Sequence, residues 1–246
     1  MTEAILQLQT TLDRLLEGKW IERILEAGGG SASHLKIPDA ACLIGIDVSE
    51  KQLQRNNVLD EKILGDVQTY ALPESDFDII ICWDVLEHLP RPMCAVENFL
   101  RAIKEDGLIV LALPNLYSMK GMLTKYTPFW FHVWVRRHLF GEKEAGTEDF
   151  GPFPTFLRFS VTPSAIKRFA RERGMAIEYF CIYESQMHRV FKERHRTLGI
   201  IWSILSLVVQ TLTLNGISAN LTDYVIMLRK PKPNAASHNS FNRSAG

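Results

Sequence analysis

The stretch ILEAGGGSAS, residues 24–33, decides how this chain is expected to fold. An apolar run and an acid, Glu26, lead directly into three consecutive glycines, a pattern that predicts a strand turning sharply toward a helix. Gly28 and Gly30 carry no Cβ atom to hold a ligand away from the backbone. We therefore expect this turn to let a nucleotide approach the chain closely.

Two nucleotide-binding patterns compete for the turn. The dinucleotide pattern G-x-G-x-x-G requires a glycine at position 33, where the chain has Ser33. The pattern acid-x-G-x-G-x-G is matched by Glu26, Gly28 and Gly30, with Ala32 in place of the last glycine. Because alanine adds only a methyl group, the second pattern fits the chain better than the first.

Further apolar runs follow the turn and alternate with helical stretches. The runs are CLIGID (42–47), KILGD (62–66), FDIIICWD (77–84) and GLIVLALPN (107–115), with helices expected at 49–57 and 93–104. This alternation predicts an α/β fold with a parallel sheet, in which ligands bind beyond the carboxyl ends of the strands. The strand ends carry Glu26, Asp47, Asp66, Asp84 and Asn115.

The spacing of these polar residues suits a bound nucleoside. Asp47 follows Glu26 by 21 positions, where a carboxylate can accept hydrogen bonds from both ribose hydroxyls. Asp66 is placed to meet an adenine amino group, and Val67 to pack against the ring. The alternative for any single strand-end acid is a turn or a helix cap.

The rest of the chain divides into a lid, a helix, two strands and a tail. Residues 116–160 are rich in aromatic side chains and lack a strand pattern, so we expect an inserted cap that either encloses a substrate or forms its own small core. A helix is expected at 163–173, strands at 175–184 and 223–230, an apolar helix at 198–214, an amphipathic helix at 1–19 and a disordered tail at 232–246.

These features together resemble a known enzyme family. Glu26-x-Gly28-x-Gly30, Asp47, GDVQTYALPESDFDIIICWDVLEHLPRP (65–92) and KEDGLIVLALPN (104–115) are similar to class I S-adenosylmethionine-dependent methyltransferases. The resemblance is to small-molecule enzymes of the ubiquinone-biosynthesis type, which share an Asp-Val-Leu-Glu-His-Leu-like stretch. It covers residues 20–115 well and the remaining helix and strands loosely.

The resemblance implies a fold, a cofactor and a set of roles. The fold would be Rossmann-like and doubly wound, with seven mostly parallel strands, an antiparallel last strand and an aromatic-rich cap, in one domain over residues 20–231. The protein would be an S-adenosyl-L-methionine-dependent methyltransferase (EC 2.1.1.-). Its cofactor would be S-adenosyl-L-methionine, and no metal ion is expected. Glu26, Gly28 and Gly30 would contact its methionine part, Asp47 its ribose, and Asp66 and Val67 its adenine, while Asp84 would face the cofactor and the substrate entrance.

Methyl transfer to an oxygen or nitrogen atom of a small, hydrophobic acceptor requires that the acceptor atom, the methyl carbon and the sulfur lie in line. If the acceptor is a phenol or an amine, a base is also needed to remove its proton. His88 is the candidate base because it follows the strand at 77–84, although a histidine there also commonly caps a helix or holds a loop. His132 and His138 in the lid are weaker candidates. Two rivals remain, an NAD(P)-dependent oxidoreductase and a non-catalytic protein that binds S-adenosylmethionine as a scaffold.

The composition of the chain limits the kinds of partner that the protein is expected to bind. Lys and Arg number 28, as do Asp and Glu, so no overall positive field favours nucleic acid. The four cysteines lack metal or disulfide spacing and three lie in apolar runs, which indicates buried, reduced thiols in a cytoplasmic protein. The apolar stretch 198–212 is too short to span a bilayer, and the basic and apolar segment 189–214 that contains it is expected to contact a membrane surface or to be buried as a cap or dimer helix.

Overall fold

The computed structural model describes residues 2–30, 33–147, 151, 153–214, 216–218 and 220–232. Ala32, which replaces the last glycine of the turn pattern, lies outside the described residues, as does the predicted disordered tail from residue 233 onward.

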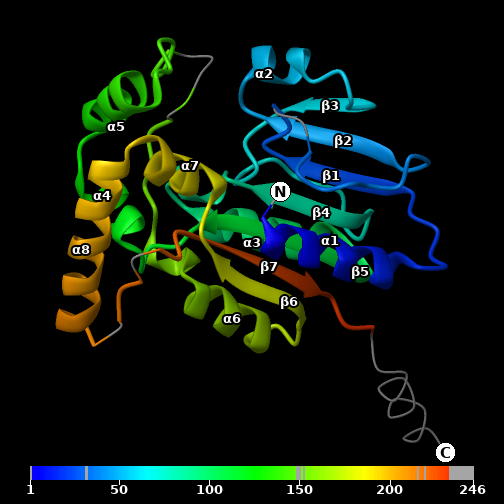
Figure 1. Ribbon diagram of the computed structural model, residues 1–246. Coiled ribbons are helices and arrows are strands. Elements are labelled where there is room, and N and C mark those ends of the chain that lie inside the picture. The colour runs from blue at the N-terminus through cyan, green and yellow to red at the C-terminus, as the bar shows by residue number, and fades with distance from the viewer. Residues whose placement is uncertain are drawn as a thin grey trace, which may run out of the picture.

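A seven-stranded sheet runs through the molecule in the order β3-β2-β1-β4-β5-β7-β6 (Figure 1). Its strands are β1 Arg23–Ala27, β2 Cys42–Asp47, β3 Glu61–Leu64, β4 Phe77–Trp83, β5 Ile103–Pro114, β6 Ala176–Tyr183 and β7 Asp223–Arg229. The first five pair in parallel, while β7 is antiparallel to both of its neighbours. The predicted α/β sheet with a reversed last strand is therefore confirmed.

Helices cover both faces because the central strands are apolar on both sides. In β4, Ile79, Ile80 and Ile81 are all fully buried, with alternate side chains entering different cores. Helices α3 and α6 close one core, while α1 and α2 close the other. Their bounds are α1 Glu3–Leu16, α2 Glu50–Arg55, α3 Pro92–Ala102 and α6 Pro163–Glu172. The N-terminal helix thus packs onto the sheet.

The boundary between α3 and β5 differs from the prediction. The helix ends at Ala102 and the strand begins at Ile103, four positions before the predicted start. Ile103 pairs with Phe77, after which the register shifts, and Asp106 has a φ of 64° in the left-handed region. Asp106 and Gly107 thus lie at a bulge inside the strand, which local turn chemistry alone does not distinguish from a loop.

The cysteines are less buried than predicted. All four are free, but only Cys82 is buried, while Cys42 and Cys181 are half-buried and Cys94 is exposed. Cys42 lies on β2 next to the edge strand β3, and Cys181 lies on the edge strand β6, where fewer strands cover them. The apolar runs therefore predicted these strands correctly, but two of the three cysteines in them are less buried than expected.

The lid contains helices that its composition does not predict. They are α4 Met119–Tyr126 and α5 Phe129–Val135, followed by a π-helical turn, Arg136–Phe140. Two more helices, α7 Gln186–Arg194 and α8 Arg196–Leu212, follow β6. Figure 1 shows α4, α5 and α8 along one edge of the molecule, beside the sheet rather than on either of its covered faces.

The first turn of α4 rests directly on the exit of β5. The Ser118 hydroxyl donates to the Asn115 carbonyl (2.7 Å) and accepts from the Gly121 N–H (2.9 Å). A Cβ at Gly121 would lie 2.1 Å from the Asn115 carbonyl oxygen. Only glycine lets the cap begin so close to the sheet.

We expect Gly121→Ala to destabilise the protein by about 1–3 kcal/mol, because the Asn115 backbone must move to admit the methyl group. Urea unfolding at constant pH measures this change. Leu123→Ala on the exposed side of the same helix is the control and should change stability by less than about 0.5 kcal/mol. Equal losses in the two variants would contradict the close contact.

Candidate functional site

A cleft of about 520 Å³ lies at the carboxyl ends of β1, β2, β3 and β4. It is the edge at which ligands bind in parallel α/β sheets. The sequence-predicted residues that line it are Gly28, Gly30, Asp47, Asp66, Val67, Asp84 and His88. Folding therefore brings together seven of the eight predicted site residues, which are spread over 61 positions of the chain.

The glycine turn is required by the protein's own packing as well as by any ligand. Gly28 has a φ of 84°, and a Cβ there would lie 2.3 Å from Cγ2 of Val85. A Cβ at Gly30 would lie 2.5 Å from the Gln52 Cβ. The turn thus packs between the ends of β2 and β4, and any side chain would push these ends apart.

Glu26 is the predicted site residue that does not line the cleft. It lies within β1 and is 6% exposed, and its Oε2 atom has no hydrogen-bond partner among the described residues. Burial raises the pKa of its carboxyl group, while a hydrogen bond from Ser33 lowers it. None of the described residues thus supplies a hydrogen bond to this second oxygen.

Asp47 and Asp66 both act as turn residues and as cleft residues. An Asp47 oxygen accepts from the Ser49 N–H (2.8 Å), and an Asp66 oxygen accepts from the Gln68 N–H (2.8 Å). The Gln68 side chain also donates to both Asp66 oxygens. Burial raises the pKa of Asp47, against hydrogen bonds that lower it. Each carboxylate oxygen can accept more than one hydrogen bond, so the two roles are compatible.

Asp84 holds a strained position at the end of β4. Its φ is 53°, in the left-handed region that non-glycine residues seldom adopt. The surrounding protein and the nearby Asp223 carboxylate raise its pKa to about 6, although Lys120 and Arg136 oppose the shift. The side chain is nevertheless exposed to the open cleft, so water screens part of this effect.

His88 holds the cap onto the sheet. Its Nδ1 lies 2.9 Å from the Pro154 carbonyl oxygen, which can only accept, so Nδ1 carries the proton. The Glu87 carbonyl accepts from the N–H groups of Phe156 and Leu157. The loop-holding alternative for His88 is thus present in the structure, while its Nε2 lies 3.8 Å from Oε1 of the buried Glu87.

Several residues of the cleft carry no signal in the sequence. His34 stacks on Trp83 with ring centroids 4.7 Å apart, and both line the cleft. Phe153 and Phe156 of the lid also line it, as the enclosing interpretation of the cap predicts. By contrast, α5 has no buried side chain, so its aromatics do not form a separate core. His34 lies in a loop, where no periodicity marks a residue as inward-facing.

The weaker histidine candidates bond within the cap. The Nε2 of His132 lies 3.1 Å from the Thr127 hydroxyl, and the Nδ1 of His138 donates to the Trp134 carbonyl. Neither lines the cleft.

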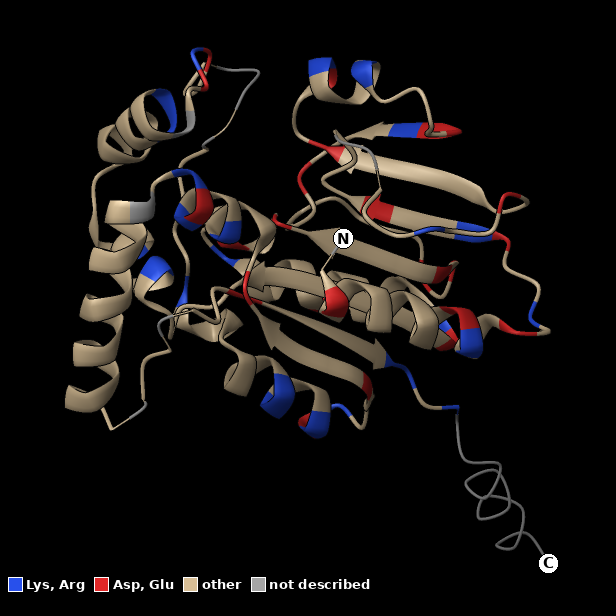
Figure 2. Cartoon of the chain, viewed as in Figure 1, with Lys and Arg blue, Asp and Glu red and all other residues tan. Residues whose placement is uncertain are grey.

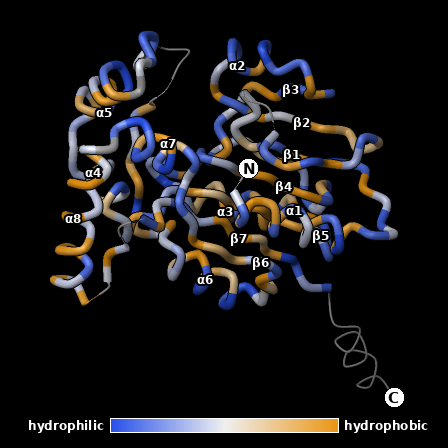
Figure 3. The backbone as a smooth tube through the Cα atoms, in the orientation of Figure 1, coloured by the Kyte–Doolittle hydropathy of each residue, from blue (hydrophilic) through white to orange (hydrophobic). Residues whose placement is uncertain are grey.

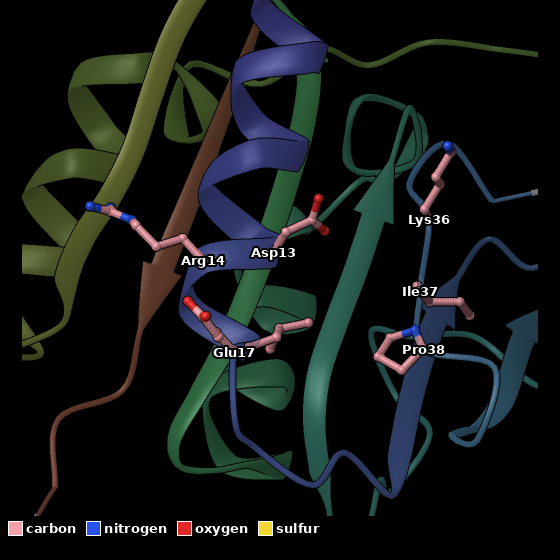
Figure 4. A pocket seen from close by; sticks show the side chains of 7 residues that line it. Asp13, Arg14, Glu17, Lys36, Ile37 and Pro38 are labelled. Atoms are coloured by element: carbon pink, nitrogen blue, oxygen red, sulfur yellow. The ribbon is translucent and has the colours of Figure 1, made fainter.

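Another hollow lies on a different surface. It is an open groove between the end of α1 and residues 36–38, and it shares no residue with the cleft (Figure 4). Its exposed walls mix both signs of charge, with Asp13, Glu17, Arg14 and Lys36 among them. In the described part of the chain, no group of three or more His, Cys, Asp or Glu is arranged to hold a metal ion.

Comparison with known proteins gives a consistent family. Residues 25–111 match the family described as methyltransferase domain. The chain is 24% identical over 159 residues to the ubiquinone biosynthesis O-methyltransferase of Thiobacillus denitrificans, covering 61% of this chain and 62% of that protein. It is 26% identical over 170 residues to the enzyme of the same name from Neisseria meningitidis, covering 63% and 64%. The matches thus span less than two thirds of these relatives.

Solved structures agree on the fold. The phosphoethanolamine N-methyltransferase 2 of Haemonchus contortus, bound to S-adenosyl-L-methionine, superposes with a TM-score of 0.53 at 16% identity, covering 92% of this chain and 52% of that one. The [4+2]-cyclase SpnF superposes with a TM-score of 0.51 at 14% identity, covering 92% and 81%. The second structure is named for a different reaction, so the fold alone does not specify methyl transfer.

We expect Asp84→Asn to stabilise the protein at pH 8. A raised pKa means that the folded state binds a proton more tightly than the unfolded state, so stability falls as pH rises from the unfolded value of about 3.8 through about 6. The unscreened shift corresponds to about 3 kcal/mol, and exposure to the cleft reduces it to about 1 kcal/mol.

Urea unfolding of both proteins at pH 8 and pH 3.5 measures this difference. The asparagine keeps the shape of the side chain and tolerates a left-handed φ, so the stabilisation should disappear at pH 3.5. A destabilised variant at pH 8 would show that the carboxylate is held by favourable interactions instead.

Proposed function

We propose that this chain, whose residues 25–111 belong to the methyltransferase domain family, binds S-adenosylmethionine in the cleft and transfers the methyl group to a small, hydrophobic acceptor. The observation that carries the proposal is the convergence of the glycine turn, Asp47, Asp66 and Asp84 on one cleft. Chance folding would not readily place these four features around a volume that fits an adenosine.

The cofactor would lie along the strand ends in the order that the family implies. The turn at Gly28 and Gly30 would face its methionine part, with the unpartnered Glu26 oxygen close behind the turn. Asp47 would accept from the ribose hydroxyls, and Asp66 and Val67 would border the adenine. Asp84 would face the sulfonium, whose positive charge a carboxylate stabilises.

The charge distribution supports a cationic cofactor in this half of the molecule. Residues 1–115 contain 10 Lys and Arg against 19 Asp and Glu, whereas residues 116–246 contain 18 against 9. The net charge of zero therefore conceals an acidic half, residues 1–115, and a basic half, residues 116–246. An acidic cleft favours the sulfonium over the phosphates of a dinucleotide.

The two rival functions are less well supported. The family match does not favour an NAD(P)-dependent oxidoreductase, and Ser33 departs from its glycine pattern. A non-catalytic protein that binds the cofactor would keep the same cleft, so only turnover separates it from an enzyme.

Calorimetry tests cofactor binding. We expect S-adenosylmethionine and S-adenosylhomocysteine to bind and NAD to show no heat of binding. Asp47→Ala should weaken S-adenosylmethionine about 10- to 100-fold, because two hydrogen bonds to a charged acceptor are lost. Asp39→Ala on the exposed loop before β2 is the matched control and should bind as the wild type does. Binding of NAD instead would overturn the proposed cofactor.

We also propose that the cap contacts a membrane surface through α8. The helix turns its small and polar side inward, since Gly199, Trp202 and Ser206 lie on one face and are buried or half-buried. Its apolar side chains point outward, with Ile204 58% and Leu207 65% exposed. This is the reverse of a helix that packs onto a protein core.

The chemistry around α8 favours an anionic lipid surface over other occupants. Figures 2 and 3 show a helix that is apolar along its length and carries no charge beyond its first turn. The basic residues Arg189, Lys192 and Arg194 lie on α7 immediately before it. An apolar face beside basic groups suits the interface of an anionic bilayer. No helix among the described residues is long and apolar enough to cross a bilayer.

Flotation with vesicles tests this contact. We expect the protein to float with phosphatidylglycerol vesicles, to float less at high salt, and to remain unbound to pure phosphatidylcholine. The double variant Ile204→Glu and Leu207→Glu should lose binding, whereas Val58→Glu, at an exposed apolar position after α2, should retain it. Failure to float, or a dimer by light scattering that the double variant abolishes, would show that α8 meets a second copy instead.

A further inference from the structure

The connection between β1 and β2 lacks the helix that its glycine turn predicts. The described residues 33–41 form bends and turns only, so the chain passes from β1 to β2 without a helix there. In nucleotide-binding α/β folds, a helix that begins at such a turn offers its free N–H groups to the anionic part of the ligand. An anionic group bound at this turn therefore has to find its hydrogen-bond donors elsewhere.

The N–H groups of the glycine turn are themselves bonded within the protein. Those of Gly28 and Gly29 both donate to the Ile46 carbonyl, at 2.8 and 3.2 Å. The Gly30 N–H faces the Asp47 carboxylate and lowers its pKa by hydrogen bonding. The turn thus lets a ligand come close without offering it a nest of free N–H groups.

The cleft holds few side chains that can donate to an anion. None of the described residues that line it is a lysine or an arginine. The amino acid part of S-adenosylmethionine nevertheless carries a carboxylate, which needs donors once it leaves water. Ser49 and Gln52 can donate, but they follow β2 beside Asp47, where the ribose would lie. His88 directs its Nδ1 proton to the Pro154 carbonyl.

His34 is the donor best placed for this carboxylate. Its ring stacks on Trp83, with the planes 18° from parallel, and no hydrogen bond joins either ring nitrogen to a described residue. Burial lowers the pKa of His34, so most of the rings are neutral at pH 7 and carry one N–H to donate. Trp83 ends β4, and β4 lies next to β1, so the stack stands beside the turn that would face the methionine part.

A side chain of α1 holds the loop that carries His34. The Gln9 amide donates to the Lys36 carbonyl (3.0 Å) and accepts from the Lys36 N–H (2.8 Å), as a neighbouring strand would. It also donates to Asp13 (2.7 Å), which orients the amide because a carboxylate only accepts. Gln9 is 6% exposed, so these bonds are shielded from water. α1 thus fixes the backbone two positions after His34.

The packing beside this contact acts in the same direction. Leu35 is buried in the core cluster that contains Leu8 and Leu12 of α1. The groove in Figure 4 runs along the same contact, between α1 and the strand of chain that carries Lys36. With Leu35 in the core and Lys36 bonded to α1, the ring of His34 is left on the cleft side of the loop.

We propose that His34 binds the carboxylate of the methionine part of the cofactor and that Gln9 is its positioning residue. The inference rests on the proposed methyltransferase function. The imidazole N–H donates to a carboxylate oxygen, while Trp83 keeps the ring flat against the cleft wall. Gln9 holds the loop where the ring can stack. In this way α1, which contributes no residue to the lining of the cleft, influences how tightly the cofactor binds.

Calorimetry with two ligands separates the carboxylate from the nucleoside. S-adenosylhomocysteine carries the amino acid part, whereas 5′-methylthioadenosine is the same nucleoside without it. His34→Phe keeps a ring to stack on Trp83 but removes the donor. It should raise the Kd of S-adenosylhomocysteine about 10- to 100-fold and change that of 5′-methylthioadenosine less than about 2-fold. His34→Gln, which keeps an N–H donor, should recover part of the loss.

A double-mutant cycle tests the role of Gln9. Gln9→Leu should raise the Kd of S-adenosylhomocysteine about 3- to 10-fold in the wild type and change it no further beside His34→Phe, because its effect passes through His34. Gln7→Leu is the matched control and should bind as the wild type does, since Gln7 meets Glu3 and Tyr179 instead of the loop. Urea unfolding identifies the folded variants, and Gln9→Met replaces Gln9→Leu if the latter does not fold.

The outcomes separate the proposed function from the role of His34. If the wild type binds neither ligand, the proposed function itself fails. If it binds both and His34→Phe leaves both Kd values unchanged or weakens both alike, His34 does not bind the carboxylate. If Gln9→Leu weakens binding by the same factor with and without His34, Gln9 is not its positioning residue.

Discussion

The structure depends on the close approach of the glycine turn to the end of β4. At Gly28 the chain takes a left-handed conformation while the Val85 side chain occupies the space of a Cβ. Because β1 lies between β2 and β4, this contact and the one between Gly30 and Gln52 hold three strand ends at one edge. The cleft is the space that remains above them, and its walls are those strand ends. A larger side chain at either glycine would separate the walls before it met any ligand.

Negative charge gathers on the same edge. Glu26 and Glu87 are buried, Asp223 pairs with Lys120, and Asp84 lines the cleft itself. Desolvation raises the pKa of Glu26, Asp84 and Glu87, which means that folding works against these charges. Perturbed pKa values of this kind cluster at functional sites, and the positive charge of the proposed cofactor would offset the repulsion between these carboxylates.

Much of the cofactor side could be predicted because its signals are local. Asp47, Asp66 and Asp84 each follow an apolar run, and parallel strands bring their carboxyl ends to one edge. The sequence did not show whether a strand-end aspartate lines the cleft or stabilises a turn. Asp47 and Asp66 do both, because each also accepts a backbone hydrogen bond within its own turn. Glu26, predicted for the same site, is buried in β1 behind the turn and does not line the cleft. His34 and Trp83 were missed because stacking between a loop and a strand end leaves no period in the sequence.

The sequence by itself determined the strands, their alternation with helices and the glycine turn, because periodicity and missing side chains act between near neighbours in the chain. Only the tertiary structure decided which groups meet across long separations. It put His88 under the lid at Pro154, 66 positions away, and it turned α8 so that its apolar side faces outward. The sequence of an apolar helix does not show which of its faces is buried, because this depends on which other parts of the fold pack against the helix.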